Sequence, residues 1–72
     1  MNLKDEIARV EALCWETIVA YASSAELKVE LMREPVAGDD KWVMHIGAWT
    51  CNGLSKLEVL YRAAMHAEAS GR

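Results

Sequence analysis

The first hydrophobic pattern along the chain is helical and covers residues 2–23. Its apolar residues recur at steps of three and four, which places them along one side of a helix: Leu3, Ile7, Val10, Cys14, Ile18 and Tyr21. Asn2 is a natural N-cap, and Asp5 and Glu6 fall in the first turn, where the helix dipole favours negative charge. The apolar side is widened by Ala8, Ala12, Trp15 and Val19. A helix this widely apolar needs two neighbours, and the Ser23-Ser24 pair predicts its end.

The next segment, residues 26–33, admits two interpretations. Apolar and polar residues alternate there, as in a half-buried strand: Leu27, Lys28, Val29, Glu30 and Leu31. The stretch from Ser23 to Glu26 instead matches a helix capping box. We favour a strand, because the strand-like segment 42–49 needs a partner for its backbone groups and 26–33 can supply one.

The connection between these two segments, Glu34 to Asp40, is rich in residues that turn a chain. Pro35 fixes φ, Gly38 permits positive φ, and the Asp39-Asp40 pair can bond its own backbone. We therefore predict a β-hairpin that is closed by a seven-residue loop.

Residues 41–49 are apolar on both faces of the predicted strand. One face would carry Trp42, Met44, Ile46 and Ala48, and the other Val43, His45 and Trp49 around Gly47. A chain of 72 residues has little interior with which to cover both faces. Either its two helices sandwich this strand, or a second chain covers one side. Trp42 and Trp49 should point to opposite faces, and we expect Trp42 to be partly exposed or covered by another chain.

A second helix is predicted over residues 54–69. Thr50 to Gly53 ends the strand, and Ser55 to Glu58 is a capping box directly before an apolar run. The apolar stripe of this helix is formed by Leu57, Leu60, Tyr61, Ala64 and Met65. The predicted architecture is therefore a single small α+β domain over residues 1–72 with the order α-β-β-α. Two helices pack on a β-hairpin, and we expect this domain to dimerise.

Composition adds a reason to expect a partner and excludes some partner classes. The hydrophobic fraction of 53% is slightly above the globular average of about 45–50%, so a monomer should expose apolar surface. The formal net charge is −3, and the eight basic residues are scattered along the chain rather than clustered. This pattern argues against nucleic-acid binding and against an anionic membrane surface. The acidic start and the lack of a long apolar run lead us to expect a cytoplasmic protein.

The candidate chemical groups do not form a catalytic or metal-binding motif. Cys14, His45, Cys51 and His66 lie at gaps of 31, 6 and 15 positions, without the paired short spacings of structural zinc sites. Cys51 precedes a predicted helix N-terminus, which can lower the pKa of a thiol, but no oxyanion loop is evident. We predict two free buried thiols, no metal, no cofactor and no enzymatic activity.

The candidate functional residues are therefore partner contacts. Glu11 falls inside the apolar arc of the first helix, where its carboxylate must reach water, pair with a base such as Arg62 or His45, or face a donor of a partner. Tryptophan is enriched at the energetic centres of protein interfaces. The predicted partner-binding residues are Trp42, Met44, His45, Trp49 and Glu11.

These features lead to two hypotheses of function. In size, acidity and Trp/Met content the chain is similar to the small accessory proteins of bacteriophages and mobile elements, anti-CRISPR proteins among them, many of which bind and block a host protein. That similarity is one of composition and transfers no residue. The first hypothesis is a non-enzymatic interaction module that binds a protein partner and forms homo-oligomers. The alternative is a homodimer that binds a small apolar ligand at the subunit seam, with Glu11, His45 and Tyr61 as lining residues.

Overall fold

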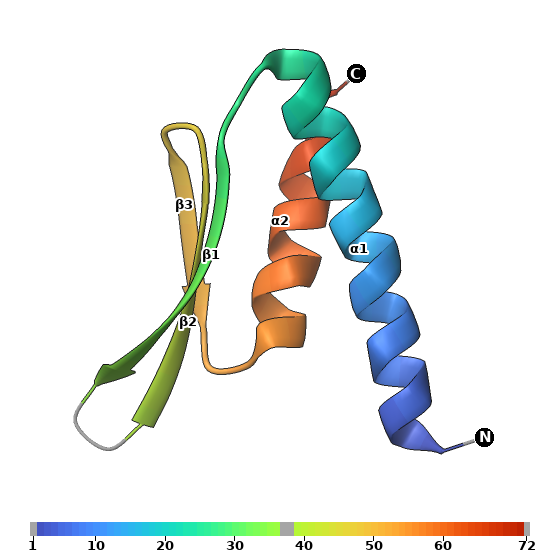
Figure 1. Cartoon of the computed structure of the whole chain (residues 1–72), viewed down its shortest axis with the longest axis vertical. Coiled ribbons are helices and arrows are strands. Elements are labelled where there is room, and N and C mark those ends of the chain that lie inside the picture. The colour runs from blue at the N-terminus through green and yellow to red at the C-terminus, as the bar shows by residue number, and fades with distance from the viewer. Residues whose placement is uncertain (1, 37–38, 72) are drawn as a thin grey trace.

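The computed structural model describes residues 2–36 and 39–71 and consists of two helices and three strands (Figure 1). The elements follow the order α1 (Leu3–Ala25), β1 (Val29–Val36), β2 (Asp39–Ile46), β3 (Trp49–Gly53) and α2 (Lys56–Ser70). The strands form one antiparallel sheet in the order β1-β2-β3, and the two helices pack against it. The predicted α+β class is confirmed. The predicted α-β-β-α order is corrected, because the sheet has three strands rather than two.

The extra strand arises from a tight turn at Gly47 and Ala48, inside the segment predicted as one strand. Ile46 and Trp49 are paired across this turn, so only two residues connect β2 to β3. Gly47 has a φ of +59°, and its N–H donates a hydrogen bond to the carbonyl of Lys28 at 2.9 Å. A glycine with positive φ at the first central position is the pattern of a type II′ hairpin turn, which suits the twist of antiparallel strands. The single strand over 42–49 was therefore a wrong prediction.

This turn places both tryptophans on the same side of the sheet. Directly paired residues of antiparallel strands share a face. Trp42 and Met44 lie opposite Gly53 and Cys51, so Trp49 of β3 faces the helices together with Ile46 of β2. The prediction that Trp42 and Trp49 point to opposite faces is wrong, because a two-residue turn shifts the inward positions from even to odd numbers.

The outer face of the sheet is mainly polar, and neither described helix lies over it (Figure 1). The register assigns to this face Glu30, Met32, Glu34, Lys41, Val43, His45, Thr50 and Asn52. Val43 is buried there between its cross-strand neighbours Met32 and Asn52. The prediction of a strand that is apolar on both faces is therefore wrong, since alternation separates an apolar inner face from a polar outer one.

The strand interpretation of residues 26–33 is confirmed, with β1 displaced by three residues toward the C-terminus. Pairing of β1 with β2 runs from Val29 opposite Ile46 to Val36 opposite Asp39. The predicted seven-residue loop from Glu34 to Asp40 is therefore wrong, because most of it is strand, and residues 37–38 lie outside the described residues. Pro35 is compatible with this position, since β1 is an edge strand and a missing N–H is tolerated at an edge.

Both predicted helix N-caps are confirmed. The side chain of Asn2 accepts a hydrogen bond from the N–H of Asp5 at 2.9 Å, and that of Ser55 accepts one from the N–H of Glu58 at 3.1 Å. The carboxylate of Glu58 accepts from the N–H of Leu54 at 3.3 Å, which fixes the entry into α2. These bonds satisfy backbone donors that have no partner inside the helix.

The end of α1 differs from the prediction, because the helix continues through Ser23-Ser24 to Ala25. The chain leaves the helix at Glu26, which adopts a left-handed conformation with φ 57° and ψ 43°. The N–H of Glu26 bonds to the last-turn carbonyls of Ala22 and Ser23, and Leu27 also bonds to Ala22 at 2.8 Å. This is the geometry of a glycine C-cap, here with a glutamate in its place.

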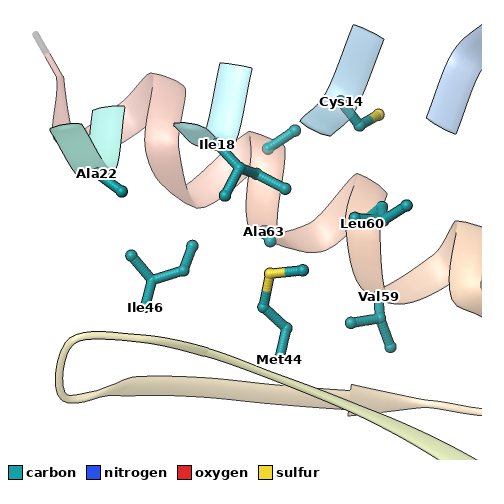
Figure 2. Close-up of a cluster of buried hydrophobic side chains, with 9 residues drawn as sticks. Cys14, Ile18, Ala22, Met44, Ile46, Val59, Leu60 and Ala63 are labelled. Atoms are coloured by element: carbon teal, nitrogen blue, oxygen red, sulfur yellow. The ribbon is translucent and has the colours of Figure 1, made fainter. Parts of the chain in front are cut away.

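The hydrophobic core joins all three layers through α2. Ile18, Met44, Ile46, Val59 and Leu60 are the largest fully buried side chains. Figure 2 shows Met44 and Ile46 pointing from the sheet toward the helices, while Ile18 and Ala22 reach down from α1. In Figure 1 α2 lies between α1 and the sheet. Alanines on α2, at 63, 64 and 67, are buried and allow close approach on both of its sides.

The resulting molecule is thin and open for its length. Its extents are 35 × 34 × 15 Å, and its radius of gyration is 12.6 Å. A compact domain of 72 residues has a radius of gyration of about 11 Å. In Figure 1 the N-terminal turns of α1 diverge from α2 and the sheet, which accounts for part of this difference.

Candidate functional site

Apolar surface is concentrated on α1. The exposed large hydrophobic residues of the described chain are Leu3, Val10, Leu13, Trp15 and Val19 on α1, Met32 on β1, Leu54 before α2, and Tyr61 and Met65 on α2. Only Cys14, Ile18 and Ala22 of α1 are buried. The wide apolar arc of this helix predicted two neighbours, but α2 is its principal neighbour. Both flanks of the buried stripe therefore remain open to solvent.

One flank of α1 borders a groove of about 450 Å³, which we call the α1–β1 groove. It is lined by Ala8, Glu11, Ala12, Trp15, Leu31, Lys56 and Leu60. Trp15 is 40% exposed and forms one wall, and Leu31 of β1 contributes to the opposite side. Glu11 and Lys56 are the charged lining residues, so the groove is an apolar trough with one carboxylate and one ammonium group.

The other flank of α1 borders a smaller hollow of about 220 Å³, which we call the α1–α2 furrow. It is lined by Leu13, Cys14, Thr17, Tyr61, Ala64, Met65 and Glu68. Leu13 is 57% exposed and Tyr61 is 56% exposed, so the aliphatic and aromatic groups here face water. Two separate apolar surfaces thus lie on either side of the contact between α1 and α2.

The predicted strand residues occupy different environments. Met44 is fully buried and has no surface to offer a partner in this conformation. Trp42 is half-buried, and the guanidinium of Arg33 lies 5.8 Å from its ring centroid. Trp49 is half-buried and stacks on the imidazole of His66, with centroids 4.2 Å apart and planes 5° from parallel. These two tryptophans pack against the core from its edges.

His45 lies on the outer face of the sheet, away from the tryptophans. Its Nδ1 shares a hydrogen bond with the hydroxyl of Thr50 at 2.9 Å. Beside it, Lys28 and Glu30 form an ion pair at 2.8 Å. The hydrogen bond from Lys28 lowers the pKa of Glu30 below its ordinary value. A solvent-exposed pair of this kind contributes little to stability, so the surroundings of His45 are an ordinary polar surface.

Glu11 lies where its sequence position predicted, inside the apolar side of α1. It is half-buried in the α1–β1 groove, and within residues 2–36 and 39–71 no ion pair to it is observed. The suggested partner Arg62 instead pairs with Glu58 at 2.9 Å and donates to the carbonyl of Asn52 at 3.0 Å. The other suggested partner, His45, lies on the far side of the sheet.

Burial disfavours the thiolate form of both cysteines. Cys14 and Cys51 are free thiols, and burial raises the pKa of both above the ordinary value. For Cys14 the nearby carboxylates of Glu68 and Glu11 raise the pKa further, and for Cys51 the charge of Arg62 opposes the shift. In the part of the chain that the structure describes, no group of three or more His, Cys, Asp and Glu side chains is arranged to hold a metal ion.

Most of the residues that form the exposed apolar flanks were missed as functional candidates. The signal was present for one flank, because Ala8, Ala12, Trp15 and Val19 follow one another at steps of four, three and four. This is the spacing of a coiled-coil seam. This stripe runs beside the buried stripe that contains Cys14. It can be recognised as a second packing surface only once the first stripe is known to pack inside the protein's own core.

No family model, curated protein or solved structure matches this chain. Neither helix, over the residues described, combines the length and the apolar character that crossing a bilayer requires.

Proposed function

We propose that this chain is a small non-enzymatic protein–protein interaction module that acts on a partner protein as an inhibitor or regulator. The observation that carries the proposal is the apolar surface that α1 leaves exposed on both of its flanks. Contiguous apolar surface on a small domain is typical of a protein-binding site.

The total exposed area supports a missing partner. The chain exposes 5058 Å², whereas a compact monomer of 8.0 kDa exposes about 4,450 Å². The excess of about 600 Å² approaches the ~800 Å² that each partner contributes to a standard protein interface. A bound protein on the helical side would bring the exposed area close to that of an ordinary small domain.

The helical side also holds side chains suited to binding. Trp15 and Tyr61 are large amphipathic groups that fill pockets at low cost in conformational entropy, and such groups dominate interface energies. The outer face of the sheet is mainly polar and offers fewer anchors of this kind. We therefore place the binding surface on α1 and α2 rather than on the strand 42–49.

Site-specific photo-crosslinking tests this placement. Benzoylphenylalanine is introduced at position 13 or 19 on α1 and, as a matched control, at position 50 on the outer face of the sheet. We expect protein adducts from position 13, from position 19 or from both, in host extract or in the purified protein, and few from position 50. Equal labelling from position 50, or no adduct from α1, would contradict the proposal.

The alternative is a homodimer that binds a small apolar ligand, and the α1–β1 groove favours it. Its volume of about 450 Å³ lies within the range of small-molecule sites, about 300–1,000 Å³. Of the lining residues suggested from the sequence, only Glu11 borders this groove; His45 is on the outer sheet face and Tyr61 borders the α1–α2 furrow.

A thermal-shift screen with apolar metabolites separates this alternative from the first proposal. A ligand of the groove should raise the melting temperature of the native chain and of Tyr61→Ala, but not of Trp15→Ala or Glu11→Ala. An unchanged melting temperature across the screen would count against a ligand site.

A further inference from the structure

We infer that the stripe Ala8, Ala12, Trp15 and Val19 is the docking surface for α1 of a second copy, with the two helices antiparallel about a twofold axis. This inference rests on the proposed interaction function and names the partner. It places the dimer contact on α1 rather than on the strand segment 42–49, where the sequence had suggested that a second chain could cover one face.

The stripe has the geometry of a second helix-packing seam on α1. Its four residues follow a spacing of four, three and four, as alternate core positions of a coiled coil do. They lie on the groove flank of α1, next to the stripe formed by Cys14 and Ile18 that packs against the protein's own core. Trp15 and Val19 are each 40% exposed, and both alanines are exposed. A helix can therefore reach all four residues without displacing the core.

The sizes of these residues are complementary when the stripe meets itself in the antiparallel direction. With the twofold axis midway between positions 13 and 14, Ala12 lies opposite the partner's Trp15. Ala8 lies opposite the partner's Val19. Each small residue thus faces a larger one, and the symmetry repeats both contacts. Alternating small and large side chains across a seam is how packed layers interdigitate.

Charge complementarity fixes the same direction. Arg9 and Glu16 flank the stripe on its solvent side, and the antiparallel arrangement brings Arg9 of each copy within side-chain reach of the partner's Glu16. Among residues 2–36 and 39–71 of its own chain, Arg9 makes one distant, exposed ion-pair contact, with Glu6 at 3.9 Å, and a helix partner can replace it. A parallel arrangement would instead leave Arg9 and the partner's Glu16 seven residues apart along the helices and on opposite sides of the seam.

The groove provides the space that the second helix needs. A copy of α1 laid along the stripe would enter the α1–β1 groove and cover the exposed parts of Trp15 and Leu31. The ~600 Å² by which the chain exceeds the area of a compact monomer is close to half of a standard interface. An isologous contact of this kind is closed and gives a dimer rather than a fibre.

The occupant is a second copy because the pattern is complementary to itself. One axis position satisfies the two size pairings and the charge pairing at once. Binding to an unrelated protein would require the small, large and charged residues of α1 to match that protein's surface. It would not require the residues of α1 to match one another across a twofold axis.

Sedimentation equilibrium tests the assembly with an adjacent pair of substitutions. The native chain should weigh twice 8.0 kDa at high micromolar concentration. Ala12→Glu puts a charge into the seam and should weaken dimerisation about a hundredfold or more. Leu13→Glu adds the same charge to the next residue, on the other flank of α1, and should leave the dimer intact. Circular dichroism verifies that both variants are folded.

A charge exchange tests the pairing itself. Arg9→Glu and Glu16→Arg should each weaken the homodimer about tenfold, because each places like charges across the axis. Mixed in equal amounts, the two variants should form a heterodimer with restored affinity, since every like-charge contact then becomes an opposite-charge contact. A purely local role of Arg9 in its own helix predicts no such rescue.

Different failures separate the inference from the proposed function. A native chain that stays at 8.0 kDa, a dimer insensitive to Ala12→Glu, or a mixture without rescue overturns the antiparallel α1 dimer. The interaction module survives that result when photo-crosslinking at position 13 or 19 captures a different protein. A chain that stays monomeric and also yields no crosslinked adduct overturns both the antiparallel dimer and the interaction module.

Discussion

Replacing Ile18 by alanine tests the orientation of α1, on which the assignment of its exposed flanks depends. Ile18 is fully buried at the junction of α1, α2 and the sheet. Truncation of a buried isoleucine costs about 2–5 kcal/mol, because both the transfer free energy and the packing around the new cavity are lost. We expect about 3 kcal/mol here. A domain of 72 residues has a free energy of unfolding of about 4–11 kcal/mol, so this one side chain supplies a large share.

The matched control is Leu13→Ala, on the same helix but 57% exposed. It should change the free energy of unfolding by no more than about 0.5 kcal/mol. Urea denaturation followed by circular dichroism gives both values. For an m-value of about 1 kcal/mol per molar urea, Ile18→Ala should lower the midpoint by about 3 M. Equal effects of the two substitutions, or a larger one at Leu13, would mean that α1 packs through the other side and that the proposed docking stripe is not at the surface.

Four further predictions concern the turn, the helix end and, in two cases, the thiols. Gly47→Ala should destabilise by about 1 kcal/mol, since an L-residue at φ +59° is strained and the new Cβ would lie 2.8 Å from Cδ2 of Leu27; an unchanged urea midpoint would contradict the turn. Glu26→Gly should stabilise by about 0.5 kcal/mol, because glycine removes the left-handed strain at the end of α1 but adds freedom to the unfolded chain; a lower midpoint would argue against this cap. Cys14 and Cys51 should react with iodoacetamide more slowly in the folded than in the urea-unfolded chain, and faster folded-state alkylation would refute their raised pKa values. Because the pKa of each thiol is higher in the folded chain, each thiol contributes its full stabilisation at pH values below the ordinary pKa of 9.0. This contribution is lost as the pH rises through the folded pKa, so the urea midpoint should fall at alkaline pH.

The helices could be predicted from the sequence because their signals are local. Asn2 and Ser55 mark the helix starts through their own side-chain hydrogen bonds, and the three-four spacing of apolar residues needs no knowledge of distant contacts. The end of α1 was less predictable, since Ser23-Ser24 is tolerated in a helix when the following residue forms the cap. Glu26 does so at a position where glycine is the usual signal.

The sheet was partly mispredicted because a hydrophobic run hid a turn. Gly47-Ala48 carries the glycine-first signal of a two-residue hairpin, but the apolar residues on both sides of it suggested one continuous strand. The turn is marked by a switch from even-numbered to odd-numbered inward residues. Met44 and Ile46 are inward on β2, whereas Trp49 and Cys51 are inward on β3. Trp42 and Trp49 were expected on opposite faces, so that another chain could cover Trp42, and the turn removes that requirement by placing both on the inner face.

The candidate site depended on contacts that residue spacing does not determine. Glu11 was expected inside the apolar arc and lies there, in the α1–β1 groove. Trp15 widens the apolar side of α1 as predicted, yet it is 40% exposed, because α1 packs mainly on α2. The width of an apolar arc can be counted from the sequence, whereas the number of elements that cover it is a property of the whole fold.

The central position of α2 has a consequence for how this chain reaches its native state. α2 joins α1 to the sheet and follows both of them in chain order (Figure 1). Until the ribosome has completed α2, the apolar inner face of the sheet and the apolar stripe of α1 that α2 will bury are both exposed to solvent. Nascent chains and molecules cut before Lys56 should consequently aggregate or recruit chaperones, although each of their elements carries its own folding signals.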